Sequence, residues 1–352
     1  MENIRKEERG VALVRNDMKI LCPITTSDDI EILNPQKYNT EFYCGYMPEW
    51  WEDLFNNNNT SNSVSSPINN RNNKTSNVRS KEELERIVNG SRKYNTDTFL
   101  AINAKYYPNY IYPYLERYLG EIYDLGIRKA IVCDLGMISL INKKYPEMKV
   151  SVSCLNQVTN SYAVDFYLQF DNVERIVFPR HMSIKEIIEI ADHFPNVDFE
   201  YFIFSNKCIY DDGYCRGLHE FTPICKDLFY DNYYGVNGSV LNDQTIKHLQ
   251  AEGLVYREWT RHDNYMKNKG YCTRSFACTA CSLRDLSHKE NIVSVKLSIR
   301  GHDVTERLRQ VKMARSAIEA EKTGDIEKIK KTVSTLFGKD DLCDCQTACM
   351  MI

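Results

Sequence analysis

The sequence predicts an α/β fold of the TIM-barrel type, a (β/α)8 barrel, and three observations support this. The chain has 352 residues and 43% hydrophobic content, which is enough for one large core. Eight short segments have the apolar, aromatic and β-branched content of buried strands. A helical pattern follows most of them, and the alternation of strand and helix is typical of a parallel sheet. Eight such units close a barrel.

Each expected strand is a short apolar run. The strands are expected at Lys19–Ile24, Thr40–Met47, Thr98–Ala104, Lys129–Asp134, Lys149–Cys154, Val173–Phe178, Asp198–Ser205 and Ile292–Ile299. Two of the intervening helices have start signals in the sequence. Ser183 with Glu186 forms a capping box ahead of an amphipathic run, and Asp303 with Glu306 opens another such run.

The expected barrel-like domain covers residues 18–335, between a charged N-terminal extension (1–17) and a cysteine-rich tail (336–352). Residues 56–79 are rich in Asn and Ser and almost free of large apolar side chains. Such a segment cannot bury enough surface to offset the entropy of ordering it. We therefore expect a disordered insertion after the second strand.

Charge and cysteine usage restrict the class of protein. The formal net charge of -3 gives no overall attraction to nucleic acid, although a local basic groove remains possible. The N-terminus has no apolar signal region and no segment is long enough to span a membrane, so a cytoplasmic protein is expected. Thirteen cysteines in that compartment indicate metal ligation or burial rather than a disulfide framework.

A long segment, residues 207–284, replaces the helix expected after the seventh strand. It contains Cys208, Cys215, Cys225, Cys272, Cys278 and Cys281. Turn residues between the first two cysteines fold them toward each other, which suits a metal or a cluster. We expect Cys208, Cys215 and Cys225 to bind an iron-sulfur cluster, with Cys281, Cys278 or Cys272 as fourth ligand. The alternative is zinc, bound by Cys208 and Cys215 together with the Cys278-x-x-Cys281 pair.

The same region resembles a known family. The spacing Glu200-x-Phe-x5-Cys208-x4-Gly-x-Cys215 is similar to the signature of the peptidase U-32 (collagenase-like) family. Residues 176–183, 282–286 and 293–300 resemble further blocks of that family, in the family's order. The resemblance implies a barrel-like domain and raises Arg180 and Glu200 above other candidate site residues.

The resemblance also implies an activity. Similar proteins carry a four-iron four-sulfur cluster and take part in oxygen-independent hydroxylation of RNA or quinone rings, with prephenate implicated as the oxygen source. The first hypothesis is therefore an iron-sulfur-dependent hydroxylase or other modification enzyme, acting on RNA, a quinone-like ring or a peptide, with a homologous partner subunit as a further possibility. The alternatives are a U-32 peptidase hydrolysing collagen-like or other peptides, and a non-catalytic zinc or cluster protein acting through a partner. No familiar protease motif is present.

Polar residues at the C-terminal ends of the strands are the candidate site, because barrel active sites are built there. They are Asn103, Asp134, Asn156, Gln157, Arg180, Glu200, Lys296 and Arg300. We expect Arg180 and Arg300 to bind a carboxylate bidentately, and Glu200, beside Arg180, to accept or relay a proton. For each residue alone, a salt bridge without catalytic role is about as good an explanation. The strand cysteines Cys22, Cys44, Cys133 and Cys154 are expected to be small buried residues.

Overall fold

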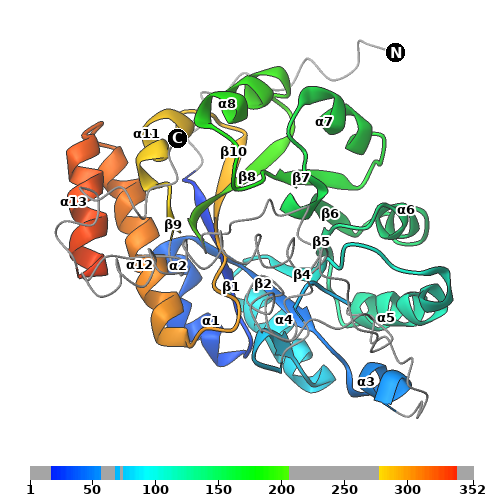
Figure 1. Ribbon diagram of the computed structural model, residues 1–352. Helices are drawn as coiled ribbons and strands as arrows, with labels where there is room; N and C mark the ends of the chain where they lie inside the picture. Colours follow the sequence, from blue (N-terminus) through cyan, green and yellow to red (C-terminus); the bar gives the residue numbers. More distant parts are fainter. Residues whose placement is uncertain (1–16, 57–67, 72–73, 206–276, 339–352) are drawn as a thin grey trace, which may run out of the picture.

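The computed structural model describes residues 17–56, 68–71, 74–205 and 277–338 (Figure 1). Eight parallel strands form a closed ring in these residues. They are β1 (Lys19–Pro23), β2 (Thr40–Tyr46), β4 (Thr98–Ile102), β5 (Lys129–Val132), β6 (Lys149–Val152), β7 (Val173–Val177), β8 (Asp198–Ser205) and β10 (Ile292–Leu297). Each strand pairs with the next, and β1 pairs in parallel with both β2 and β10, which closes the ring. The predicted TIM-barrel-like fold and all eight strand positions are confirmed.

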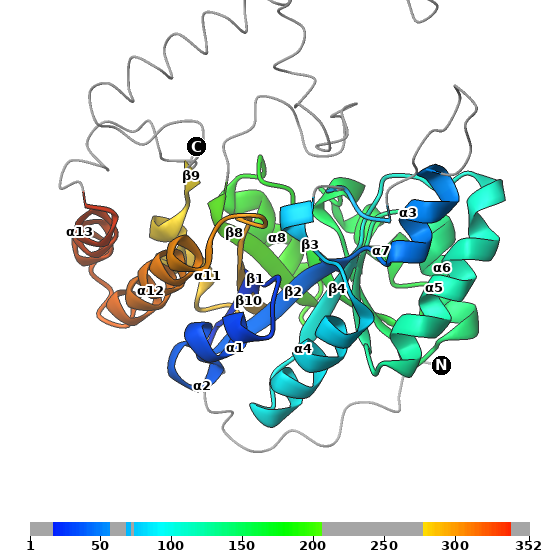
Figure 2. The same ribbon diagram turned by 90° about the horizontal axis from the view of Figure 1, so that it is seen from below.

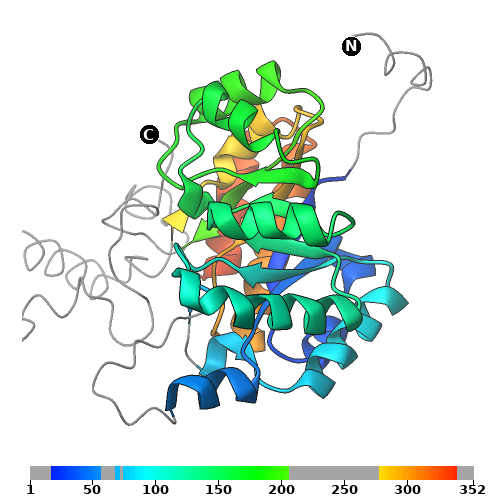
Figure 3. The same ribbon diagram turned by 90° about the vertical axis from the view of Figure 1, so that its right-hand side faces the viewer.

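Helices surround the ring on its outside. They are α1 (Asp28–Leu33), α2 (Pro35–Tyr38), α3 (Glu49–Asn56), α4 (Lys81–Lys93), α5 (Tyr112–Asp124), α6 (Leu135–Lys144), α7 (Ser161–Tyr167), α8 (Ile184–His193), α11 (Leu283–Leu286), α12 (Val304–Glu321) and α13 (Ile326–Phe337). Figure 3 shows the helices coloured cyan to green, α4 to α8, side by side on one flank of the barrel. The predicted capping box of α8 is present, since Ser183 and Glu186 each accept a hydrogen bond from the other's backbone N–H.

The strands carry two separate sets of apolar side chains. Phe42, Cys44 and Leu100 belong to the large core between barrel and helices. Tyr43 and Phe99, their neighbours in sequence, belong with Leu21 and Ile131 to a small cluster inside the ring. This alternation follows from the period of two along a strand. Strand β2 is buried along its whole length, on both faces, as is usual for a strand of a parallel barrel.

Part of the expected disordered insertion is ordered, so that prediction was wrong for residues 68–71 and 74–79. Ile68 and Val78 are buried, and strand β3 (Asn77–Val78) pairs with the end of β2. The composition argument failed because Asn69 and Asn77 satisfy each other's polar groups at a distance of 2.8 Å instead of requiring water. Residue 56 belongs to α3, and residues 57–67 and 72–73 lie outside the described part of the chain.

Only the end of the cysteine-rich segment lies within the described residues. Strand β9 (Ala277–Cys278) pairs antiparallel with the C-terminal end of β8. Figure 2 shows β9, β3 and α3 at the same end of the barrel, which is the end where the strands terminate and is called here the C-terminal mouth. Cys208, Cys215, Cys225 and Cys272, with residues 1–16 and the tail from 339, lie outside the described residues. Among the described helices, none is both long and apolar enough to cross a membrane.

Candidate active site

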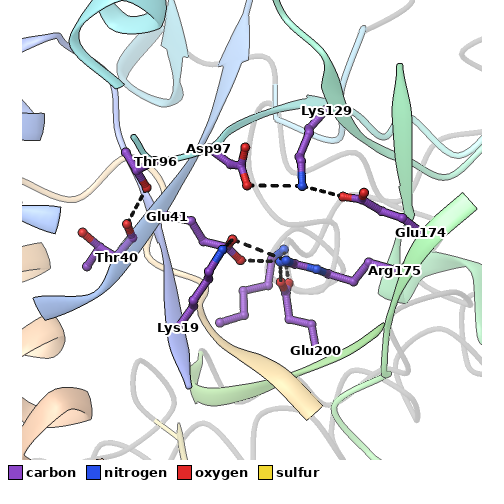
Figure 4. A network of polar contacts seen from close by, with 10 residues as sticks. Lys19, Thr40, Glu41, Thr96, Asp97, Lys129, Glu174, Arg175 and Glu200 are labelled. Carbon is purple, nitrogen blue, oxygen red and sulfur yellow. Dashed lines mark hydrogen bonds and ion pairs between the residues drawn. The ribbon is translucent and has the colours of Figure 1, made fainter. Parts of the chain in front are cut away.

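A row of buried charges crosses the inside of the barrel (Figure 4). Arg175 on β7 pairs with Glu41 on β2 and, at 3.0 Å, with Glu200 on β8. Glu200 also accepts a hydrogen bond of 2.8 Å from Lys296 on β10. All four side chains are at least nine-tenths buried. Opposite charges therefore alternate across the ring, which is how a barrel interior can hold ions away from water.

The pairing between Glu41 and Arg175 favours the charged form of both groups. Burial opposes the charge on Glu41, but the adjacent guanidinium of Arg175 holds the pKa of this carboxyl below its ordinary value. Burial likewise opposes the charge on Arg175, and Glu41 and Glu200 raise its pKa. Glu200 lies between two cations, Arg175 and Lys296. Its expected role as proton acceptor stays a prediction; the contacts show it fixing the position of Lys296.

The sequence predicts Arg180 at the barrel mouth beside Glu200, and in the structure it lies against Phe202 of the same strand. Its guanidinium carbon lies 5.8 Å from the centre of the Phe202 ring, and Phe202 is two residues beyond Glu200 on β8. Two residues of a strand advance by about 6–7 Å, so Arg180 lies one layer nearer the mouth. The amine of Lys296 lies between these layers, 4.8 Å from the centre of the Tyr43 ring and 6.0 Å from that of Phe202.

Two more arginines accompany Arg180 at the mouth. Burial and then the charge of Arg71 lower the pKa of Arg300 to about 10. Burial also lowers the pKa of Arg71, Tyr43 offsets part of this effect, and Arg180 adds to it by repulsion. Arg300 is only 6% exposed, and its Nη1 has no hydrogen-bond partner among the described residues. No carboxylate of the described chain forms a salt bridge with Arg71 or Arg300. The three guanidinium groups, called here the arginine cluster, therefore concentrate positive charge at the mouth.

Asn69 holds the arginine cluster together. Its side-chain oxygen accepts hydrogen bonds from Nη2 of Arg300 (2.8 Å) and from the backbone N–H of Arg71 (3.0 Å). Asn77 donates to the carbonyl oxygen of Arg71 at 2.6 Å. A Cβ on Gly45 of β2 would lie 2.1 Å from Oδ1 of Asn77, so glycine allows this close approach. The contacts of residues 68–71 with Asn77 thus place Arg71 over the end of β2.

The other candidate residues at the strand ends support the loops. Asp134 caps α6 by accepting from the backbone N–H of Met137 (2.8 Å), and it also accepts from Tyr112 Oη (3.0 Å). Asn103 accepts a hydrogen bond from the backbone N–H of Asn70 at 3.2 Å. Asn156 donates to the carbonyl of Cys133 at 2.8 Å, whereas Gln157 has a left-handed backbone and makes a long contact of 3.5 Å to Cys154. These contacts favour structural roles.

The described cysteines fall into two groups. Cys22, Cys44 and Cys133 are buried, and burial raises the pKa of the Cys44 and Cys133 thiols to about 12 and that of Cys22 further. They are small buried residues, as expected; Cys154 is partly exposed.

Cys278 and Cys281, by contrast, are partly exposed beside the end of β8, and the backbone N–H of Ala280 points at Cys278 Sγ (3.4 Å). Such a contact suits a ligating thiolate. Within the described ranges no group of three or more His, Cys, Asp or Glu residues could hold a metal.

Sequence reasoning missed Glu41, Arg175, Asn69 and Arg71. A signal existed for the first two, because each is a charged residue within an expected buried strand, where a partner is required. No comparable signal identified Asn69 or Arg71, because both lie in a run whose composition matches a disordered segment.

The fold and these contacts define a parallel (β/α)8 barrel with a cationic C-terminal mouth, beside which two cysteines lie. The model of peptidase family U32 matches residues 63–339, so the chain belongs to this family.

Curated relatives match parts of the chain. The tRNA hydroxylation protein P of Escherichia coli (strain K12) is 29% identical over 99 residues, which is 28% of this chain and 22% of that protein. The tRNA hydroxylation protein P2 of Bacillus subtilis (strain 168) is 20% identical over 186 residues, 53% of this chain and 54% of that protein. The matches thus span between about a fifth and a half of these relatives. The solved structure of the U32 peptidase Mk0906 aligns with 56% of this chain and 72% of that one, at 11% identity and a TM-score of 0.41.

Proposed function

We propose that this protein is an iron-sulfur-dependent enzyme that hydroxylates or otherwise modifies RNA without molecular oxygen, with a small carboxylate as co-substrate. The observation that carries the proposal is the arginine cluster, where buried Arg300 has an unpartnered Nη1 next to a second arginine, Arg71. Guanidinium groups bind carboxylates bidentately, and repulsion between two of them favours an anion between them. The names of the E. coli and B. subtilis relatives support RNA as substrate.

The proposed roles of the residues depend on their distance from the C-terminal mouth. Arg71, Arg180 and Arg300 bind and orient the carboxylate at the mouth. Below them, Lys296 is held by Glu200 and provides a fixed positive charge that stabilises negative charge developing on a bound substrate. An iron-sulfur cluster, when bound, supplies electron transfer. Cys278 and Cys281 fit such a group, because both are partly exposed at the end of β8, and Cys208, Cys215 and Cys225 are the proposed further ligands.

Peptide hydrolysis is less well supported. The thiols of Cys22, Cys44 and Cys133 are buried with raised pKa values, which is the opposite of what a cysteine nucleophile requires. A cationic mouth also offers no evident general base. Zinc in place of iron would instead support a non-catalytic zinc protein. Metal analysis of the purified protein distinguishes zinc from iron.

The test is the iron content of anaerobically purified protein, measured with turnover of RNA in the presence of a carboxylate donor. Cys208→Ser and Cys215→Ser should abolish iron binding, because a serine oxygen is a poor replacement for a soft thiolate. Cys44→Ser is the control and should retain iron, since the Cys44 thiol is fully buried in the core between the barrel and the helices. Equal iron content in the wild type and both motif variants would contradict the cluster.

A further inference from the structure

One sector of the barrel rim exposes an unusual number of aromatic side chains. Among the described residues, eight large hydrophobic side chains are exposed, and six of them follow the consecutive strands β4, β5 and β6. The six are Tyr106, Tyr110, Tyr114, Leu135, Tyr162 and Phe166. Figure 1 shows α5, α6 and α7, the helices that carry or adjoin these residues, next to one another around the ring.

Three tyrosines are the most accessible of this set. Tyr106 is 70% exposed, Tyr110 59% and Tyr162 87%. A buried or interface tyrosine normally gives up most of its surface, so these rings are available for contact with another molecule. Tyr106 and Tyr110 lie between β4 and α5, and Tyr162 lies in the first turn of α7, which places all three on the mouth side of the barrel.

The three loops form one continuous surface. The backbone N–H of Tyr107 donates to Asp134 at 3.3 Å, which joins the loop after β4 to the loop after β5. Asn156, in the loop after β6, donates a hydrogen bond of 2.8 Å to the carbonyl oxygen of Cys133, in the loop after β5. We call the surface formed by residues 103–112, 134–136 and 153–162 the aromatic rim.

The aromatic rim is also continuous with the arginine cluster. Tyr107 Oη donates to the carbonyl of Ile68, and Asn103 accepts from the backbone of Asn70 at 3.2 Å. Both contacts are made to the segment that carries Arg71. The only acid in the sequence of the rim is Asp134, and it is occupied by hydrogen bonds to Met137, Tyr112 and Tyr107. The described rim therefore carries one carboxylate, and hydrogen bonds hold it against the loop backbone.

We infer that the aromatic rim binds the unpaired bases of a single-stranded RNA loop, which stack on Tyr106, Tyr110 and Tyr162. The sugar-phosphate backbone of the RNA is directed toward the arginine cluster. The inference rests on the proposed function, because it takes RNA as the substrate. Exposed aromatic rings beside a cationic groove are the combination used by proteins that bind single-stranded nucleic acid. A base that is to be modified must leave its stack, and exposed rings compensate for that loss.

The test is direct binding, measured by fluorescence anisotropy at a fixed salt concentration. The probes are a labelled RNA stem-loop with a seven-base loop and a blunt-ended RNA duplex. Wild type should bind the stem-loop more tightly than the duplex. The triple variant Tyr106→Ala, Tyr110→Ala and Tyr162→Ala should bind the stem-loop at least tenfold more weakly, since one stacked base contributes about five- to a hundredfold in affinity.

Two controls separate stacking from other effects. Ile32→Ala with Leu336→Ala removes exposed apolar side chains from α1 and α13, far along the chain from the aromatic rim, and should leave RNA binding unchanged. The corresponding triple Tyr→Phe variant should bind like wild type, because stacking requires the ring and not the hydroxyl group. The salt dependence of binding should be unchanged in the triple alanine variant, which keeps its phosphate contacts.

The inference is overturned if the wild type and the triple alanine variant bind stem-loop RNA equally, or if the wild type has equal affinity for stem-loop and duplex. It is also overturned if the triple variant changes its oligomeric state, because that would identify the aromatic rim as a protein interface. The two proposals fail differently. If the wild type contains no iron and shows no turnover but still binds loop RNA through the aromatic rim, only the proposed function is contradicted. If the wild type turns over RNA and the triple alanine variant binds RNA as tightly as the wild type does, only the RNA-binding role of the aromatic rim is contradicted.

Discussion

At the scale of single residues, the barrel interior is stable only because its charges alternate. Glu41, Arg175, Glu200 and Lys296 are each buried, and each has a partner of opposite charge within hydrogen-bond distance. The ring of Phe99 lies against Arg175, with 4.8 Å between its centre and the guanidinium carbon. Removing one member would leave an uncompensated buried charge, which costs far more than the pair contributes.

Arg175→Met should therefore lower the free energy of unfolding by about 3–5 kcal/mol at neutral pH. The loss should shrink as pH falls. In wild type the pKa of Glu41 is lowered, so its stabilisation is present above the ordinary glutamate pKa and is lost as pH drops through the folded-state value. In the variant Glu41 can take up a proton and relieve its burial. Denaturant titrations between about pH 4 and 7 measure this.

The control for Arg175→Met is Arg86→Met, which removes an exposed pair with Glu83. It should cost less than about 1 kcal/mol. A loss for Arg175→Met that does not change with pH would contradict the role assigned to Glu41.

The arginine cluster leads to the opposite expectation for Arg71. Its positive charge opposes those of Arg180 and Arg300, so Arg71→Met should stabilise the anion-free protein by roughly 1 kcal/mol. A small dicarboxylate such as succinate should raise the melting temperature of wild type and have less effect on the variant. The backbone hydrogen bonds of Arg71 do not involve its side chain, so the segment should stay in place. An equal succinate response in both proteins would remove Arg71 from the site.

At the scale of elements, the segment 68–79 connects the loops of the mouth. It adds β3 to the end of β2, supplies Arg71, and accepts a hydrogen bond from Tyr107 through Ile68. Its position depends on Gly45, whose missing side chain leaves room for Asn77. Gly301 makes similar room for Ser76 on the other side, and its φ of 93° favours glycine as well.

Gly45→Ala should displace this segment and cost about 1–3 kcal/mol, the usual range for overpacking. It should also weaken the succinate-dependent rise in melting temperature, because Arg71 moves with the segment. Gly120→Ala in α5 is the matched control: its Cβ would meet only Tyr145 Oη, at 3.6 Å, and a helical alanine stabilises by about 0.5–1 kcal/mol. Retention of the full anion response in Gly45→Ala would show that the segment does not position the site.

At the scale of the whole molecule, the barrel closes between its first and last strands, and α12 reinforces that seam. Arg307 donates to Asp29 (2.7 Å) and to the carbonyl of Pro23 (3.1 Å). Arg315 donates to the carbonyls of Tyr38 (3.0 Å) and Met18 (2.9 Å). Two arginines near the C-terminal end of the barrel domain thus bind the carbonyls and carboxylates of its first βα unit.

Arg307→Met should destabilise the protein by about 3 kcal/mol, because Asp29 stays buried after losing its charged partner. The effect should be local to the seam. Hydrogen exchange should quicken in β1 and β10 more than in β5, which lies on the opposite side of the strand order. Uniform acceleration in all strands would show that the seam is not a weak point of the ring.

The sequence by itself determined the barrel. Eight apolar runs alternating with helical patterns, and capping residues such as Ser183 and Asp303, are local signals, because strand burial and helix capping depend on neighbours in the chain. Arg180, Lys296 and Arg300 could also be found, since the ends of parallel strands meet at one face.

Only the tertiary structure decided which charges pair. Glu41 and Arg175 are 134 residues apart, and Asn69 and Arg300 are 231 apart. Composition describes the average tendency of a segment, so it misread residues 68–71 and 74–79, where Asn69 bonds to Asn77 and to the distant Arg300, and Asn70 bonds to Asn103. The arginine cluster and the aromatic rim exist because ring closure brings these separate loops to one mouth.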